Sequence, residues 1–597
     1  MTLWRKLISG LKFMSQREPC TTVEIDLDYC TRTFGVAPCN AALGGDTVRK
    51  CYNTWATCKF KSAYNKGTNT LKFCEPNSSF PVGLNYIPAL ENASGRSGTV
   101  NIAGSDDKMG ALGVRAEVQA SFVDFADGDK LTDKYWSERI SGAAQIDEGG
   151  YDPKDRLSFW AKLKARNPNY AGRPMRIVQG YVDDGIWTPD TTRNYIMSEW
   201  DGPSSRGGVK ISAKDILTLA DDEKAVAPAI SRGFLSEDID ETTTEITLLP
   251  SGIGSEYSIS GWAVIGAEIV SFERSGDVMT IVRGTRGTEA ATHSVNDTVQ
   301  ETYSCRRRRI DAVIYDLLVN YANVPASYIT FADWQAEVNR WAGQLVLTAD
   351  ICKPEGVKKL LGEIAVLGVS IWWDDVNQKI RLRMTRPEDD TNIYDVSDDF
   401  NIINITQEDM DEDRLTRVSF STVQIDPTKA LNSDNFLRTR ILIDVDAESA
   451  FNYDSQSLKT ITCRWLNHGD DALVRILSKR ILNRFNRQPV RFKVELDYKD
   501  NIELASVMRL SSRIVADESG KPANTLMQVI SRNDKVPGHS LTVETQKFQF
   551  DGRYAFICEN SRPDYNSSSA AQKSRGAYFV DDGTLLFSDG TGPYVFA

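Results

Sequence analysis

Two hydrophobic periodicities alternate along the chain and predict where its sheets and helices lie. Apolar and polar residues alternate, as in half-buried strands, through much of the first 300 or so residues and again from about 400 to 550. Thr22 to Leu27, Val114 to Phe125 and Pro174 to Val182 are examples. Residues 306 to 372 instead repeat apolar side chains every three or four positions, which is helical spacing. We therefore predict a multidomain, β-rich α+β protein.

Shorter signals refine this picture. Gly98 to Ala103 predicts a further strand, and Ile371 to Trp373 with Ile380 to Met384 predict a hairpin. Ser158 to Ala165 predicts a short helix, and Asp471 to Phe485 has the apolar stripe of a strongly amphipathic helix. Helices are therefore expected to interrupt the β-rich regions and not to replace them.

A compact β unit is predicted at about residues 230 to 304, where short strands are separated by Gly and Ser. It contains the block Arg283 to Thr288, with the sequence RGTRGT. Such glycines could line a phosphate site, but no GK[ST] follows and no helix is predicted to open there. A structural turn is the better interpretation.

The length of 597 residues exceeds what one hydrophobic core supports. We divide the chain into six segments: a cysteine-rich metal segment (1–80), the first part of a β domain (81–229), the small β module with the RGTRGT turn (230–305), a helical α+β domain (306–400), the second part of the β domain (401–555) and a C-terminal arm (556–597).

The charge balance limits the classes of partner. The net charge of −12 disfavours nucleic acid as the main partner, because phosphate binding needs a basic surface. The one dense basic run, Arg306 to Arg309, is expected at a solvated junction or in a salt bridge between subunits. Met1 to Met14 lacks the features of a secretory signal, and no apolar stretch has the length of a membrane span. We therefore expect the protein to be made in a reducing cytosol.

Cysteines are concentrated near the N-terminus, where six of the ten fall within the first 74 residues. Structural disulfides are rare in a reducing cytosol, so metal ligation is favoured over buried thiols or late oxidation. The core of the group has the spacing C-x8-C-x11-C-x6-C and consists of Cys30, Cys39, Cys51 and Cys58. Cys20 and Cys74 lie outside it and are expected to be packing residues.

The spacing restricts the metal. Zinc fingers and ribbons bring ligands in C-x2-C pairs, and bacterial ferredoxins use C-x2-C-x2-C. Long, uneven gaps let each thiolate come from a separate loop, which suits a cubane iron–sulfur cluster or an irregular zinc site. Spacing alone leaves both open. A metal that joins distant loops would stabilise a segment with few residues to bury.

No catalytic constellation is visible. The three histidines, His293, His468 and His539, belong to no nucleophile elbow, zinc-protease or deaminase motif. Acidic pairs such as Asp389-Asp390 or Asp398-Asp399 are expected by chance among 82 acidic residues. We therefore expect no enzymatic activity.

Two stretches carry a family resemblance. The segment IDLDYC…GVAPC…KCYNT…TC…LKFC resembles the cysteine region of tail hub and tail tip proteins of long-tailed, siphovirus-type bacteriophages, including lambda-like tail tip proteins and gene-transfer-agent hub proteins. The stretch AEIVSFE…MTIVRGTRGTEAATHSVNDTV resembles a β module found repeatedly in phage tail and baseplate proteins. Residues 310–384 and 471–555 resemble, more weakly, the helical and β-barrel parts of baseplate hubs.

The resemblance implies a function. Some of these proteins carry a cysteine-bound [4Fe-4S] cluster, and the matching ligands are Cys30, Cys39, Cys51 and Cys58. A family hub is typically a homotrimer with β-barrel domains that closes the tail tube in the virion after synthesis in the bacterial cytoplasm. It contacts the distal tail protein, the tape-measure protein and a tail fibre or receptor-binding protein. The alternatives are a zinc-stabilised binding module, a tail-associated cell-wall hydrolase and a cytosolic iron–sulfur enzyme.

Overall fold

The structure is a computed structural model. It describes residues 18–548, except for 46, 77–79, 82, 97, 103–111, 148–149, 153–157, 343–344, 387, 389–391, 450–453, 470, 487–489, 498–501 and 537–539, and it describes the short strands β30 (Tyr554–Ala555), β31 (Ala577–Tyr578) and β32 (Val595–Phe596). Among these residues, no helix has both the length and the apolar character needed to cross a membrane. The predicted C-terminal arm, 556–597, falls almost entirely outside this description.

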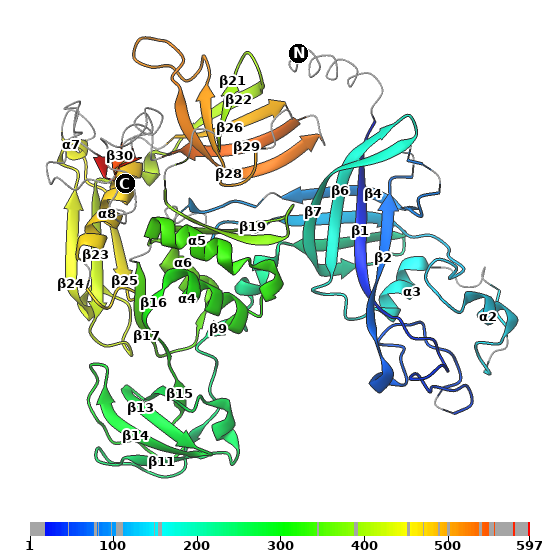
Figure 1. Ribbon diagram of the computed structural model, residues 1–597, viewed down its shortest axis with the longest axis horizontal. Coiled ribbons are helices and arrows are strands. Elements are labelled where there is room, and N and C mark those ends of the chain that lie inside the picture. The colour runs from blue at the N-terminus through cyan, green and yellow to red at the C-terminus, as the bar shows by residue number, and fades with distance from the viewer. Residues whose placement is uncertain are drawn as a thin grey trace.

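The N-terminal third forms a closed sheet, which we call barrel 1 (Figure 1). Its eight strands are β1 (Glu18–Cys30), β2 (Lys66–Cys74), β3 (Ile87–Pro88), β4 (Leu90–Arg96), β5 (Glu117–Val123), β6 (Pro174–Asp183), β7 (Ile186–Asp201) and β8 (Gly208–Lys214). Their order is β3-β2-β1-β6-β7-β8-β5-β4. Only Ala89 separates β3 from β4, so the first and last strands are two halves of one bent strand, and the sheet closes on itself.

The interior of barrel 1 explains why the alternating pattern folds this way. Val23 and Ile25 of β1 are buried together with Phe73 of β2, because every second side chain of a strand faces the same side. The short helix α3 (Phe159–Arg166) adds the fully buried Trp160, whose ring stacks on that of Phe73 at a centroid distance of 4.9 Å. The predicted helix over Ser158 to Ala165 is confirmed, and the Ser158 side chain caps it by accepting the amide N–H of Ala161.

A second closed sheet, barrel 2, lies in the C-terminal part of the chain. Its strands are β21 (Ile393–Ser397), β22 (Ile402–Asp409), β26 (Val490–Asp497), β27 (Val507–Ser511), β28 (Thr525–Val536) and β29 (Ser540–Lys547), in the order β21-β27-β28-β29-β26-β22. Here too the outermost strands, β21 and β22, are consecutive in the sequence. Val494, Val529 and Val543 are among the side chains that fill its interior.

The two barrels share one topology. In each, the first half of the bent strand pairs in parallel, β3 with β2 and β21 with β27. The second half pairs antiparallel, β4 with β5 and β22 with β26. Three consecutive antiparallel strands follow, β6-β7-β8 and β27-β28-β29, and the last of each trio pairs with β5 or β26. Barrel 1 differs by the two additional strands β1 and β2.

A mixed body with a large hydrophobic core lies beside barrel 1 and below barrel 2 in the view of Figure 1. It contains β9 (Val226–Ala227), β16 (Tyr303–Arg309), β17 (Val346–Ile351), β18 (Glu355–Gly356), β19 (Val369–Asp374), β20 (Lys379–Met384), and the helices α4 (Ile310–Asp316), α5 (Phe331–Ala342) and α6 (Val357–Ala365). The hairpin predicted from Ile371 to Met384 is confirmed by the pairing of β19 with β20.

A three-stranded sheet packs on this body and interrupts barrel 2. It consists of β23 (Arg417–Gln424), β24 (Phe436–Ile443) and β25 (Leu458–Cys463). The short helix α7 (Val445–Glu448) connects β24 to β25, and helix α8 (Asp471–Phe485) follows β25. The amphipathic helix predicted for 471–485 is confirmed with the same bounds. Phe420, Ile461 and Trp465 belong to the core of the body and not to that of barrel 2. The elements from β23 to α8, which lie within the segment predicted as the second part of the β domain (401–555), therefore pack on the body and not in barrel 2.

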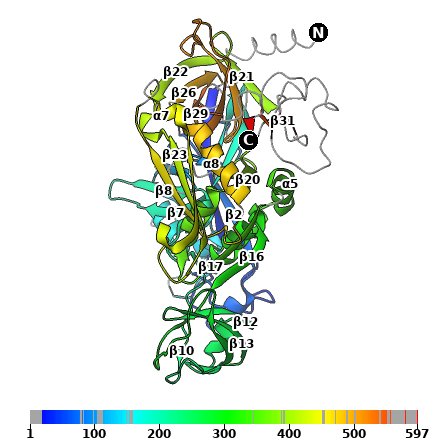
Figure 2. The same cartoon turned by 90° about the vertical axis from the view of Figure 1, so that its left-hand side faces the viewer.

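The small β module projects at one end of the molecule in both views (Figures 1 and 2). Its strands are β10 (Phe234–Leu235), β11 (Glu245–Leu249), β12 (Ser260–Ile265), β13 (Glu268–Ser275), β14 (Val278–Thr285) and β15 (Val299–Glu301). The RGTRGT block continues β14 into a loop that approaches the body. At Gly287, with φ of +86°, an added Cβ would lie 2.5 Å from the carbonyl oxygen of Ile425, so only glycine fits this contact.

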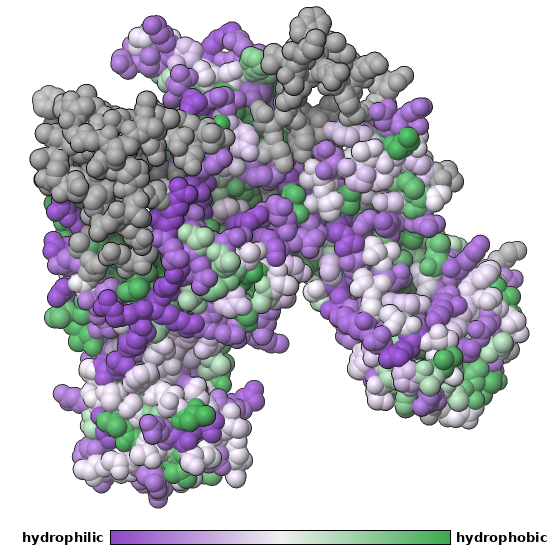
Figure 3. All heavy atoms as spheres, in the orientation of Figure 1, coloured by the Kyte–Doolittle hydropathy of each residue, from purple (hydrophilic) through white to green (hydrophobic). Residues whose placement is uncertain are grey.

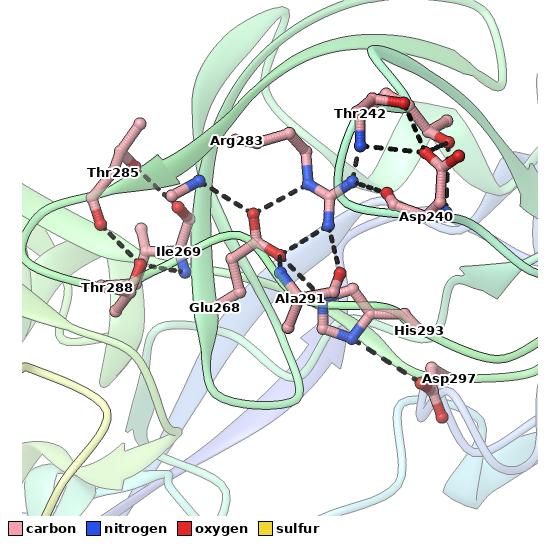
Figure 4. Close-up of polar contacts among 12 residues, drawn as sticks. Asp240, Thr242, Glu268, Ile269, Arg283, Thr285, Thr288, Ala291, His293 and Asp297 are labelled. Atoms are coloured by element: carbon pink, nitrogen blue, oxygen red, sulfur yellow. Dashed lines mark hydrogen bonds and ion pairs between the residues drawn. The ribbon is translucent and has the colours of Figure 1, made fainter.

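A buried carboxylate holds the RGTRGT loop in place (Figure 4). Glu268 of β13 accepts hydrogen bonds from the guanidinium of Arg283 at 2.8 and 2.7 Å, from the amides of Gly284 and Ala291, and pairs with His293 Nε2 at 2.9 Å. Burial would raise the pKa of Glu268, but these hydrogen bonds lower it to about 2. The loop is thus a structural turn wrapped around one anion, as its sequence predicts.

One arginine joins the three larger parts. Arg193 of β7 donates to Asp375, in the β19–β20 turn, at 2.8 Å and to Asp534 of β28 at 2.6 Å. Asn194 adds two hydrogen bonds to the carbonyl of Asp375. Barrel 1 therefore contacts both the body and barrel 2.

The strand predicted over Gly98 to Ala103 is not regular in the described part of that segment, where Thr99 makes a single bridge to Ser531 of β28.

One further expectation is corrected by the fold. The segment 1–80 is not a separate domain, because β1 and β2 lie in the wall of barrel 1 and Thr22 pairs with Val178. Three arginines of the basic run are paired within the chain: Arg306 with Asp350, Arg308 with Asp316 and Arg309 with Asp311. The fourth, Arg307, donates its backbone amide to the Thr348 hydroxyl.

Candidate metal centre

The cysteine-rich segment is a long loop between two neighbouring strands. Cys30 is the last residue of β1 and pairs with Lys66, the first residue of β2. The intervening residues 31–65, which we call the cysteine loop, therefore leave and rejoin the barrel at the same place. Cys39, Cys51 and Cys58 lie on this loop, and all four thiols are free.

The four thiols act on one another electrostatically. Burial raises the pKa of the Cys51 thiol, the backbone N–H of Asn53 opposes that rise, and the neighbouring sulfurs of Cys58, Cys39 and Cys30 raise the pKa further. The pKa of Cys58 is raised in the same way by burial and by Cys30 and Cys39, against the backbone N–H of Phe60. The spacing C-x8-C-x11-C-x6-C thus places four sulfurs within electrostatic reach of one another.

Two backbone amides point at the sulfurs. The N–H of Asn53 donates to Cys51, and the N–H of Phe60 donates to Cys58. Amide hydrogen bonds to ligating sulfur are a recurrent feature of metal–thiolate sites. Within the described residues, however, no group of three or more His, Cys, Asp or Glu side chains is arranged to hold a metal ion.

The cysteine loop is completed by residues far away in the sequence. Residues 127–147, which we call the α2 segment because they contain helix α2 (Trp136–Ser141), pack against it. The amide of Lys50 donates to Ala144 O at 2.8 Å, and that of Ile146 donates to Val48 O at 2.9 Å. The amide of Phe34 donates to the Tyr135 hydroxyl at 2.6 Å. Loop and segment form one unit, the cysteine lobe, with a small core of its own.

A fully buried ion pair lies at the centre of this lobe. The side chains of Arg139 and Asp133 are both 0% exposed and are bonded to each other. Arg139 also donates to the carbonyl oxygens of Lys50 at 3.1 Å and Cys51 at 3.0 Å. Its guanidinium lies 3.8 Å from the centre of the Tyr52 ring. Arg139 therefore holds the backbone on both sides of the Cys51 α-carbon.

Tyr52 is held from two sides. Arg166 of α3 lies 3.8 Å from the same ring centroid and forms a bidentate pair with Asp129 at 2.8 and 3.1 Å. Burial raises the pKa of Asp129 and the hydrogen bonds from Arg166 lower it, with a net decrease. The cation–π contacts of two arginines with one ring connect the cysteine loop to the wall of barrel 1.

A third set of contacts joins Cys30 to the loop. The amide of Cys30 donates to Asn53 O at 2.6 Å, and the Asn53 side chain donates to Cys30 O at 2.9 Å and to Arg32 O at 3.0 Å. Asn53 adopts a left-handed conformation with φ of +55°, which asparagine tolerates better than most residues. The backbones that carry Cys30 and Cys51 are therefore directly bonded through one side chain.

Some buried polar atoms at this site have no hydrogen-bond partner. They include Arg32 Nε, Asn53 Oδ1, the Tyr64 hydroxyl, Trp136 Nε1 and Arg139 Nη1. The hydroxyl and the nitrogens are donors. Buried donors without an acceptor among the described residues are satisfied by ordered water or by a bound anion.

The remaining sequence candidates lie elsewhere. Cys20 and Cys74 are buried in β1 and β2, and burial raises the pKa of Cys20 to about 11. Asp398 accepts from Ser512 and from the Arg513 amide, which is a structural role. The Asp389-Asp390 pair and His539 lie outside the described residues. His468 lies just before α8, on the three-stranded sheet side of the body.

Sequence reasoning found the four cysteines but missed their surroundings. Asp133, Tyr135 and Arg139 lie about 80 residues beyond Cys58 in a segment with no motif. A buried arginine in a short helix is indistinguishable in sequence from a solvated one. The only available signal is the run of aromatic residues from Tyr135 to Trp136, which is more commonly found in cores and interfaces.

No protein-family model and no curated protein matches this chain. Among solved structures it is similar to the tail protein from Neisseria meningitidis MC58, with 10% identity and a TM-score of 0.30 over 64% of this chain and 90% of that one. It is similar to the prophage MuSo2 43 kDa tail protein from Shewanella oneidensis, with 7% identity and a TM-score of 0.34 over 77% and 98%. A chain of the half-lidded Francisella PdpA–VgrG complex gives 8% and 0.28 over 91% and 61%.

Proposed function

We propose that the protein is a structural hub at the distal end of a long-tailed bacteriophage tail, where it closes the tube and connects it to receptor-binding proteins. The observation that carries this proposal is the presence of two closed barrels of one topology in a single chain. The sequence resemblance of the cysteine and RGTRGT blocks to tail proteins supports the same assignment.

The paired barrels suit a ring. A head-to-tail interface between identical chains closes when the rotation between neighbours divides a full turn. Three copies of this chain would then place six barrels of one topology around the axis. Such a ring has a nearly sixfold wall and threefold outer parts, which matches a round tube on one side and threefold attachments on the other. Its partners would be the distal tail protein, the tape-measure protein and a fibre or receptor-binding protein.

The surface of the chain fits an assembly component. Figure 3 shows hydrophilic residues over most of one face, with small apolar patches on the small β module and the cysteine lobe. On the lobe, Val48, Ile140 and Ile146 are 49%, 39% and 57% exposed. Apolar residues grouped in this way are usually covered by a partner. Both elements project from the rest of the molecule in Figure 1, where a partner can reach them.

We further propose a structural [4Fe-4S] cluster held by Cys30, Cys39, Cys51 and Cys58. Two observations support this proposal: Cys51 and Cys58 each accept a backbone amide and are acted on electrostatically by other sulfurs of the group, and the Tyr64 hydroxyl and Arg139 Nη1 lack an acceptor. An iron–sulfur cluster with four thiolates is an anion, which would suit such donors. When bound, the cluster would supply covalent cross-links between distant parts of the cysteine loop.

The resemblance of the cysteine block to tail proteins favours a cluster over zinc. A single Zn²⁺ takes its sulfurs at about 2.3 Å, so four cysteines must converge on one point, whereas a cubane offers each thiolate its own iron. Among the described residues, no group of side chains is arranged to hold a metal ion. Zinc remains the second candidate, with the same four ligands.

Electron microscopy tests the hub. The purified chain should form a threefold ring with its distal tail partner in negative stain. A protein that stays monomeric when mixed with that partner, at protein concentrations well above those applied to the microscope grid, would contradict the proposal. A lytic assay on purified peptidoglycan is the accompanying check, because activity there would place the protein with the cell-wall hydrolases.

Metal analysis tests the cluster. Protein purified without air should contain about four iron and four acid-labile sulfide per chain and absorb visible light. The variant Cys51→Ser should lose most of this metal, whereas Cys74→Ser, which changes a barrel cysteine, should retain it. Colourless protein with about one zinc would establish the alternative, and metal-free protein that assembles normally would exclude both.

A further inference from the structure

The three-stranded sheet ends in a strand whose outer edge has no partner strand among the described residues. Strand β24 pairs with β23 on one side, and the order β24-β23-β25 places it at the margin of the sheet, on the outside of the molecule in Figure 1. Residues 437–441 of this strand are all exposed. The backbone groups along such an open edge form a template for a further strand.

One face of β24 presents aliphatic side chains to water. Every second residue of a strand points to the same face, so one face carries the alternate side chains from Leu437 to Ile443. The Thr439 hydroxyl lies on this face, 2.8 Å from that of Ser421 in β23. Leu437, Ile441 and Ile443 are 70%, 59% and 44% exposed. Aliphatic residues grouped along an exposed strand edge are usually covered by a partner.

The opposite face of β24 is basic. Arg438 and Arg440 are 51% and 52% exposed and share one carboxylate, that of Asp471 at the start of α8, at 3.8 and 2.7 Å. Helix α8 packs against β23 and β24. Arg475 and Lys479 are exposed one and two turns further along the helix face of Asp471. These four cations, which we call the basic strip, therefore surround one carboxylate in a chain whose net charge is −12.

The two faces together define the chemistry of the occupant. Side chains of an added strand lie level with those of β24 on both faces, where opposite charges attract and like charges repel. The complementary strand therefore has carboxylates beside Arg438 and Arg440, and aliphatic residues beside Leu437 and Ile441. A centred antiparallel pairing of β24 with a second copy of itself would place arginine opposite arginine, which is unfavourable.

We propose that β24 and the basic strip form a docking site for an extended acidic segment of a partner protein, which adds a fourth strand to the sheet. The segment has Asp or Glu at alternate positions, towards the arginines, and aliphatic residues between them. In strand addition of this kind, main-chain hydrogen bonds supply affinity and the alternating side chains supply specificity. The inference stands on this sheet edge alone and does not depend on the proposed hub or cluster.

The probe is a fluorescent peptide of alternating Val and Glu, with the eight-residue length of β24, and its anisotropy reports binding to the full chain at low salt. We expect wild type to bind it, and Arg438→Glu combined with Arg440→Glu to weaken binding about tenfold or more, because attractive pairs become repulsive. The matched control, Arg206→Glu combined with Arg232→Glu, makes the same charge change at two exposed arginines elsewhere and should bind as wild type does. A probe that does not bind wild type, or that binds both double variants equally, overturns the inference.

Three further measurements identify the mode of binding. An all-Glu peptide of the same length lacks the aliphatic face and should bind more weakly, and equal or tighter binding would indicate ionic adsorption alone and overturn the inference. Hydrogen exchange on wild type covers the case in which the Arg438 and Arg440 variant does not fold. Amides of β24 should exchange more slowly with the probe bound, and unchanged exchange overturns strand addition. Self-association of wild type that the same variant abolishes, measured by sedimentation without peptide, would identify a second copy as the occupant and also overturn it.

Discussion

The buried pair Arg139–Asp133 offers the sharpest test of how the cysteine lobe is held. Replacing Arg139 by Met keeps much of the side-chain volume but removes the charge and all donors. Asp133 then becomes an unpaired carboxylate with no exposed surface. The carbonyl oxygens of Lys50 and Cys51 lose their guanidinium donor at the same time. We expect the contact between the α2 segment and the cysteine loop to open far more often.

The magnitude follows from the burial. Breaking a buried ion pair by removing one partner costs about 3–5 kcal/mol. One tenfold change in an equilibrium constant corresponds to about 1.4 kcal/mol, so local opening should become roughly 10²- to 10⁴-fold more frequent. Adding Asp133→Asn removes the unpaired charge and retains the oxygen that accepts the Tyr135 amide at 3.0 Å. The double variant should therefore recover a large part of the loss.

Hydrogen exchange is the suitable assay because global unfolding of a multidomain chain is not two-state. The reporters are the amides of Lys50 and Ile146, which donate across the lobe to Ala144 and Val48. Amides in barrel 2 serve as internal references and should not change. Lys134→Met is the matched control, since Lys134 lies in the same segment and makes an exposed contact to Thr33 at 2.8 Å.

Two outcomes would refute the reasoning. The first is exchange in Arg139→Met within a factor of about three of wild type, which would mean that the pair contributes little to the lobe. The second is a double variant as labile as Arg139→Met, which would mean that the unpaired charge is not the cause. Metal content measured on the same samples shows whether loop opening and loss of the proposed cluster go together.

Two further predictions follow from other parts of the fold. The pKa of Glu268 is lowered from 4.5 to about 2, so its ionised form stabilises the small β module by about 3 kcal/mol at about 1.4 kcal/mol per pKa unit. This stabilisation is complete above about pH 4.5 and is lost as the pH falls towards 2. The Glu268→Gln variant should lack this pH dependence when acid unfolding is followed by the fluorescence of Trp262. Arg193→Met should lower the temperature at which barrel 1 separates from the body by several degrees, because it leaves Asp375 and Asp534 without their shared cation; Arg232→Met, which changes a side chain that is 78% exposed, should have no effect in the same calorimetric scan.

Local pattern predicted much of the secondary structure. The alternation in Thr22 to Leu27 and Pro174 to Val182 lies within β1 and β6, and 471–485 is helix α8 to the residue. Strand alternation follows from which face is buried, and that is written in the sequence at short range. The RGTRGT block could be interpreted as a turn for the same reason, because the absence of a following GK[ST] motif can be seen in the adjacent residues.

Domain limits could not be found in this way. One of the two partners of β1 is β6, about 150 residues later, and the pairing of Thr22 with Val178 has no local signature. The boundary expected at residue 80 failed because the cysteine spacing marks a loop and not an independent fold. Likewise, β23 to β25 alternate as barrel strands would, but Phe420 and Trp465 pack into the core of the body.

The residues of the candidate site also fall into those that a local pattern indicates and those that only the tertiary packing shows. Cysteine spacing indicated Cys30, Cys39, Cys51 and Cys58 as ligands, which stays a prediction, and their thiols act on one another electrostatically in the fold. Arg139 was not found because its burial depends on the docking of α2 against the cysteine loop. A charged residue in a six-residue helix normally faces water, and only the three-dimensional fold shows this exception.

When two barrels of one topology lie in a single polypeptide, each barrel can acquire its own insertions independently of the other. Two identical subunits must carry every insertion twice, whereas halves of one gene can diverge. Here the N-terminal half carries the cysteine loop between β1 and β2, and the C-terminal half carries β23 to α8 between β22 and β26. An assembly built from such chains can decorate alternate positions of a uniform wall with different appendages, without any second gene product to tell those positions apart.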